Sequence, residues 1–107
     1  MMKMKFTFDK NLVAQHGYSL EKIYDYIKGR FSEKGFVCTS DNDVLAFAGT
    51  GTPNDYGRML GMMMIFDEAE WFLNTASSWH FTTDESKGWE DVLVQSKSKR
   101  DKKMAVV

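Results

Sequence analysis

His16 and His80 are the two histidines of this chain, and their imidazoles are the side chains best suited to move a proton near neutral pH. Neither has a cysteine or another histidine close enough in sequence to give metal-ligand spacing. Catalysis by His80 requires a neighbour that shares its proton, such as Asp84, Glu85 or Tyr56. A histidine without such a partner is usually structural or solvated, so we predict no catalytic residue, no metal site and no cofactor.

Two other features are candidate reactive or binding sites: residues 49–52 and Cys38. Residues 49–52, Gly-Thr-Gly-Thr, stand between a predicted strand and a predicted helix, where backbone amides can bind an anion. They lack the Gly-Lys-Ser/Thr of a phosphate-binding loop, and Asp55 puts a negative charge where the phosphate would lie, so we interpret them as a turn and helix cap. Cys38, in a predicted strand, is interpreted as a small buried hydrophobic residue.

An aromatic pocket is the small-molecule hypothesis. If the sheets of two copies packed face to face, they would enclose an apolar cavity, as the apolar second face of a strand over 44–48 and the three tryptophans suggest. Four residues are expected to line this cavity: Tyr56, Trp71, Trp79 and His80.

An acidic surface is the protein-binding hypothesis. Residues 1–96 hold nine Lys and Arg against 14 Asp and Glu, whereas residues 97–107 hold five against one. An acidic body repels phosphate backbones, so we expect a protein partner with a basic surface and no nucleic acid. The expected partner-binding residues are Asp67, Glu68, Glu70, Asp84, Glu85, Glu90 and Asp91.

The elements that must position these residues begin with a strand and a helix. Polar and apolar residues alternate over residues 3–8, and this pattern predicts a half-buried strand. Ser19 is placed to cap a helix whose apolar residues, from Leu20 to Phe31, form one stripe, and Gly35 is placed to end it in the left-handed conformation. Residues 36–39 and 44–48 then predict a hairpin closed by the turn formers of 40–43.

The next segment has two readings. Thr52 as cap and Pro53 in the first turn predict a helix over 53–66, rich in methionine and apolar on all sides, with Gly57 and Gly61 leaving room for another element. A capping box at Asp67 and Glu70 would instead make 57–66 a strand and 67–76 a helix. We favour the first reading, in which residues 71–73 open a strand that pairs with 79–83, and Trp89, Val92 and Leu93 belong to a short helix.

The resulting order predicts an α+β fold of the ferredoxin-like, split βαβ type: an antiparallel sheet with helices on one face, an extra strand and a short C-terminal helix. We expect one domain over residues 1–96 and a basic, flexible tail over 97–107. The single cysteine and the lack of a secretory leader predict a cytoplasmic protein. The apolar run Met59–Phe66 is far shorter than the ~20 residues of a membrane span.

Four stretches of the chain carry a resemblance to a known group of proteins. They are Phe6-Thr7-Phe8-Asp9-Lys10, His16-Gly17-Tyr18, Trp71-Phe72-Leu73 and Glu90-Asp91-Val92-Leu93. Their order resembles that in small uncharacterised bacterial proteins encoded by Firmicutes. The resemblance implies no activity and no site. The functional hypothesis is therefore a small, non-enzymatic protein-interaction or regulatory domain, and the alternative is a ferredoxin-like homodimer that binds a small apolar ligand or acts as a cofactor-free enzyme.

Overall fold

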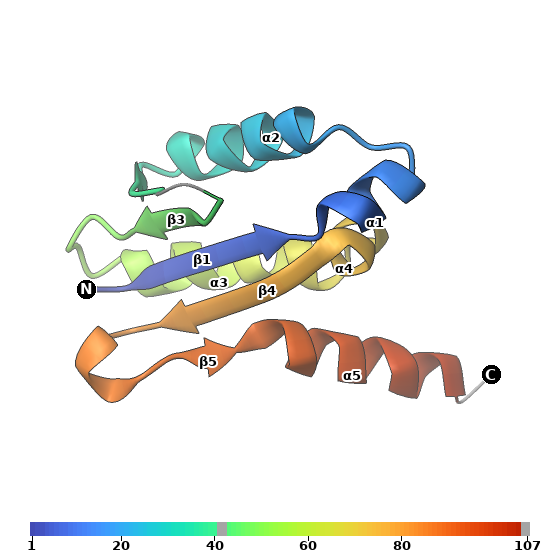
Figure 1. Ribbon diagram of the computed structural model, residues 1–107. Helices are drawn as coiled ribbons and strands as arrows, with labels where there is room; N and C mark the ends of the chain where they lie inside the picture. Colours follow the sequence, from blue (N-terminus) through green and yellow to red (C-terminus); the bar gives the residue numbers. More distant parts are fainter. Residues whose placement is uncertain (41–42, 106–107) are drawn as a thin grey trace.

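A computed structural model describes residues 1–40 and 43–105, the last three of these by their backbone alone, and shows one antiparallel sheet with helices packed against it (Figure 1). The strands are β1 (Lys3–Phe8), β2 (Val37–Cys38), β3 (Leu45–Ala48), β4 (Ala76–Thr82) and β5 (Glu90–Asp91). The helices are α1 (Lys10–Gln15), α2 (Leu20–Glu33), α3 (Asp55–Asp67), α4 (Glu70–Thr75) and α5 (Val92–Ala105), with a 3₁₀ turn η1 (Glu85–Lys87). The spatial order of the strands is β2-β3-β1-β4-β5.

The core lies between one face of the sheet and the helices. Met4, Phe6 and Phe8 alternate inward along β1, which confirms the strand predicted over residues 3–8. Phe6 is opposite Leu45 on β3 and Trp79 on β4, so it lies near the middle of the sheet. Its ring packs against five other aromatic rings, those of Phe31, Phe47, Phe66, Phe72 and Trp79.

The first helix-hairpin unit agrees with the sequence analysis. The Ser19 hydroxyl accepts the Lys22 amide at the start of α2, and Ile23, Ile27 and Phe31 are buried along one stripe. Gly35 has a positive φ of 81° just after the helix. Strands β2 and β3 pair as the predicted hairpin, although residues 41 and 42 of its turn lie outside the described residues.

One helix was missed, and another begins later than expected. Asp9 caps α1 by accepting the amides of Asn11 and Leu12, but only Val13 of this short helix is buried, so it leaves little apolar periodicity in the sequence. The favoured reading of residues 53–66 as a helix is confirmed, and the reading of 57–66 as a strand is wrong. However, α3 begins at Asp55, and Asn54, not Thr52, is its cap residue.

The hairpin expected between residues 71–73 and 79–83 is not formed. Residues 71–73 lie in α4, where the Thr75 hydroxyl donates to the Trp71 carbonyl at 2.7 Å. β4 starts at Ala76 and pairs with β1. The error has a physical cause: a three-residue apolar run has no periodicity that separates strand from helix.

The C-terminal helix is longer than the short helix that was expected. Trp89 precedes it, and α5 runs from Val92 to Ala105, so it includes most of residues 97–107. The Asp91 carboxylate accepts the Val94 amide at 3.2 Å and so satisfies one free donor at the start of the helix. Val92, Leu93 and Ser96 are buried, which fixes the first turns of α5 against the core.

Candidate functional site

His80 lies on the face of the sheet opposite the core, because β4 alternates and its neighbours Trp79 and Phe81 point inward. Its Nε2 atom is 3.9 Å from Oδ2 of Asp91, the residue paired with it on β5. Its Nδ1 atom is buried and has no hydrogen-bond partner among the described residues. The sequence analysis named other acids as candidate neighbours; the pairing of β4 with β5 brings Asp91 to His80 instead.

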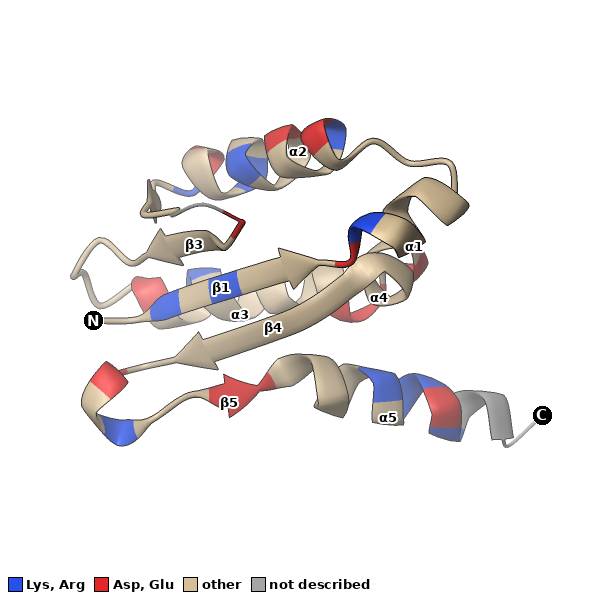
Figure 2. Cartoon of the chain, viewed as in Figure 1, with Lys and Arg blue, Asp and Glu red and all other residues tan. Residues whose placement is uncertain are grey.

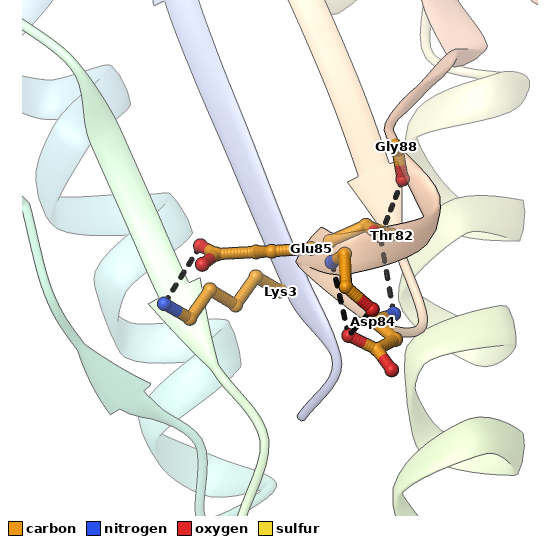
Figure 3. Close-up of polar contacts among 6 residues, drawn as sticks. Lys3, Thr82, Asp84, Glu85 and Gly88 are labelled. Atoms are coloured by element: carbon orange, nitrogen blue, oxygen red, sulfur yellow. Dashed lines mark hydrogen bonds and ion pairs between the residues drawn. The ribbon is translucent and has the colours of Figure 1, made fainter.

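The acids Asp84 and Glu85 hold the turn that follows β4 (Figure 3). The Asp84 carboxylate accepts the Ser86 amide at 3.0 Å and the Ser86 hydroxyl at 2.9 Å, and these bonds lower the pKa of Asp84. The Thr82 hydroxyl donates to the Gly88 carbonyl at 2.7 Å, which closes the turn. Glu85 extends to Lys3 of β1, where it forms an ion pair of 2.8 Å.

The predicted acidic surface is divided between the two ends of β4. Asp84 and Glu85 lie beyond its last residue, whereas Asp67, Glu68 and Glu70 lie around α4, before its first residue. Figure 2 shows acidic segments both in the turn after β4 and around α4. A strand of seven residues spans roughly 20 Å. The hairpin that was expected to bring the acids together is absent, so the structure does not gather all seven on one patch.

The loop 49–52 binds a carboxylate of its own chain. Asp55 is buried at the start of α3, where it accepts the Thr50 hydroxyl at 2.6 Å, the Gly51 amide at 2.8 Å and the Thr52 hydroxyl at 3.3 Å. These donors, Thr50 first, lower the pKa of Asp55. The donors that an external phosphate would need are therefore occupied, which agrees with a structural role for this loop, although Thr52 binds Asp55 and is not the cap of α3.

The four residues of the predicted aromatic pocket lie at different places. Tyr56 is exposed on α3, and Trp71 lies at the start of α4. Trp79 is fully buried in the core, and His80 is on the other face of the same strand. That face is polar along β1, where Lys3, Lys5 and Thr7 alternate outward, so it offers little of the apolar surface that a face-to-face dimer needs.

An aromatic groove between α2 and α4 was not anticipated. It has a volume of about 630 Å³ and is lined by Gly17, Tyr18, Ser19, Lys22, Ile23, Tyr26 and Trp71. The Tyr26 and Trp71 rings meet edge to face with their centroids 5.7 Å apart. The one available signal was Tyr26, an exposed aromatic residue outside the apolar stripe of its helix. We name this feature the aromatic groove.

A second groove lies between α3 and α5. It has a volume of about 250 Å³, and its apolar lining is Leu60, Met63, Met64, Trp79 and Val92. Asp67, Gln95, Ser96 and Lys99 complete it. At this polar end the Ser96 hydroxyl donates to Asp67, and the Lys99 ammonium is 3.9 Å from the same carboxylate. We name this feature the methionine groove.

The outward side of α3 next to the methionine groove combines exposed apolar side chains with glycines that have no side chain. Met64 is 69% exposed and Leu60 is 37% exposed. Gly57 and Gly61 lie one turn apart on the helix, and a Cβ atom built on either would meet nothing within 4 Å. The fold therefore does not require glycine at these positions, and the space above them is open to another main chain.

Other features narrow the chemistry that the protein offers. Cys38 is exposed and hydrogen-bonded to the Ser40 hydroxyl, so its interpretation as a buried residue is wrong; β2, with two residues at the sheet edge, covers little. Over the described ranges, no group of three or more His, Cys, Asp and Glu residues is placed to hold a metal ion. None of the helices in that part of the chain is long and apolar enough to cross a membrane.

The chain matches no protein-family model, and no curated protein or solved structure is detectably similar to it.

Proposed function

We propose that the protein is a non-enzymatic interaction domain that binds another protein through the outward side of α3. The observation that carries the proposal is the pair Gly57 and Gly61, whose surroundings are empty, beside the exposed Leu60 and Met64. Glycine in a helix interior is destabilising, and empty surroundings alone do not mark a contact, since Gly29 of α2 shares them. Gly57 and Gly61 differ in forming a pair four residues apart beside exposed apolar side chains, a spacing that permits close approach of a partner. Flexible thioethers suit such a surface because they adapt to the side chains they meet.

The partner's chemistry follows from the charges beside this surface. Asp67 already interacts with Ser96 and Lys99, whereas Glu68, at the end of α3, and Glu70 are exposed. An apolar segment flanked by basic residues complements this arrangement. The acids beyond β4 belong to a different part of the surface and are not included in the proposed contact.

The sheet arrangement supports a ferredoxin-like plan as part of this proposal. β3 lies between β1 and β2, and β1 lies between β3 and β4, with all neighbours antiparallel. We infer from this interleaving a plan of two split βαβ units built on α2 and α3. On this plan strand β5 and helices α1, α4 and α5 are additions. The plan hosts many functions, so the argument for binding rests on the surface of α3.

Affinity capture with matched variants tests the proposal. Met64→Lys places a charge on the proposed contact, and Val94→Lys places the same charge at a valine of α5 that is 63% exposed, close to the 69% of Met64. We expect a partner that is retained by the wild type and by Val94→Lys and is lost with Met64→Lys. Glu68→Lys should weaken retention of the same partner. Equal retention by Met64→Lys and Val94→Lys would show that α3 is not the contact.

A second function is favoured by the aromatic groove. Its volume lies within the range of small-molecule sites, and Tyr18, Tyr26 and Trp71 offer ring faces and edges to an apolar ligand. We propose this as the alternative: a domain that binds a small apolar or aromatic molecule between α2 and α4. A fragment screen by NMR tests it, with Tyr26→Ala as the variant expected to lose binding. Absence of any hit that this variant weakens would refute it.

A further inference from the structure

We propose that the indole N–H of Trp79 is the hydrogen-bond donor of the methionine groove, and that the groove binds an extended apolar peptide segment through one carbonyl oxygen. This inference rests on the proposed function and specifies the partner's form. Trp79 is fully buried, lines the groove and has an Nε1 atom without a hydrogen-bond partner among the described residues. Indole nitrogen only donates, so the matching group on a partner must be an acceptor.

Gln95 and Lys99 carry solvent-exposed donors, whereas the Trp79 indole is the buried donor of the groove that has no acceptor among the described residues. The Ser96 hydroxyl donates to Asp67, and Lys99 lies beside the same carboxylate. Burying a donor without an acceptor costs folding free energy, and nearly all buried N–H groups are paired. An acceptor supplied by a bound segment removes this cost in the complex, so the unpaired indole favours binding of a segment that carries one.

The form of the segment follows from which carbonyl groups are free. In a helix, all but the last four carbonyl groups accept hydrogen bonds from the helix itself, whereas in an extended segment each carbonyl group is free to accept one from a binding partner. Gly57 and Gly61 leave space for a main chain to lie on α3, and Leu60, Met63 and Val92 provide apolar walls for its side chain. The Nε1 atom is buried in the free protein, so the groove must open before an acceptor reaches it, and we expect the flexible thioethers of Met63 and Met64, which line the groove, to make this movement.

NMR of the tryptophan indoles tests the inference with a small probe. N-acetyl-leucine N-methylamide carries one aliphatic side chain between two carbonyl groups. The chain has three indole N–H signals, and Trp71→Phe and Trp89→Phe assign two of them outside the methionine groove, which identifies Trp79 without altering it. On titration we expect the Trp79 indole proton to move downfield and the other two to stay in place.

Variants and contrary outcomes make the experiment decisive. Met64→Lys should weaken probe binding by about tenfold, while Val94→Lys, similarly exposed but outside the methionine groove, should not change it. If the groove methyl signals shift but the Trp79 indole does not, the inference is overturned while the interaction surface stands. If no groove signal shifts, the inference is overturned as well, and the capture experiment decides separately whether α3 binds a protein.

Discussion

Replacement of Gly57 and Gly61 by alanine should make the protein more stable and at the same time weaken its binding to a partner. Alanine is favoured over glycine in a helix interior by about 1 kcal/mol per site. Neither new Cβ atom would meet anything within 4 Å, so no clash offsets this gain. The two substitutions together should raise the free energy of unfolding by about 2 kcal/mol, which corresponds to a Tm increase of roughly 8–15 °C for a domain of this size.

Gly29 of α2 provides the matched control for this prediction. It is also an exposed helix glycine, and a Cβ there would likewise meet nothing within 4 Å. Gly29→Ala should raise the free energy of unfolding by about 1 kcal/mol and leave partner binding unchanged. Urea and thermal unfolding followed by circular dichroism measure the stabilities, and retention of the captured partner measures binding.

Two results would refute the reasoning. If the double variant is no more stable than the wild type while Gly29→Ala is stabilised, then the space around Gly57 and Gly61 is not open as the structure shows. If the double variant is stabilised but binds its partner as well as the wild type, then the glycines have no role in close approach. A gain in stability with a loss of binding, seen only for α3, is the expected outcome.

Three further predictions concern the body of the fold. Gly49→Ala would place a Cβ atom 2.5 Å from the Asp55 carboxylate, so chemical denaturation should show a loss of about 1–3 kcal/mol. The lowered pKa of Asp55 means that its carboxylate stabilises the fold above its unfolded-state pKa of about 4, and that this stabilisation is lost as the pH falls through its folded-state pKa. Asp55→Asn should therefore reduce the dependence of the unfolding free energy on acidic pH. An unchanged dependence would contradict the role of the Asp55 carboxylate. Phe6→Ala should cost about 3–5 kcal/mol by urea unfolding because five aromatic rings pack on this side chain, and a loss below 1 kcal/mol would show that the cluster is not the centre of the core.

The sequence by itself determined the elements with long periodic patterns. β1 and α2 follow from alternation and from a helical stripe with a capping serine, because the buried residues of each element repeat at its own period. The helix α3 follows from strong helix formers over many residues, although its first residue differs by two positions. The structural role of residues 49–52 also followed from a local property, the charge of Asp55, although the helix cap lies at Asn54 and not at Thr52.

Only the tertiary structure decided where short segments and isolated functional groups belong. Residues 71–73 are a helix because Phe72 and Leu73 reach the core in that form, and β4 pairs with β1, whose residues lie 68 to 79 positions earlier in the chain. This pairing separates the acidic residues and buries Trp79, whereas the pairing of β4 with β5 brings Asp91 to His80. Long-range pairing depends on the shape and burial of the whole core, so a local pattern cannot specify it. The two grooves arise for the same reason: each is formed by helices whose relative positions are set by the sheet beneath them.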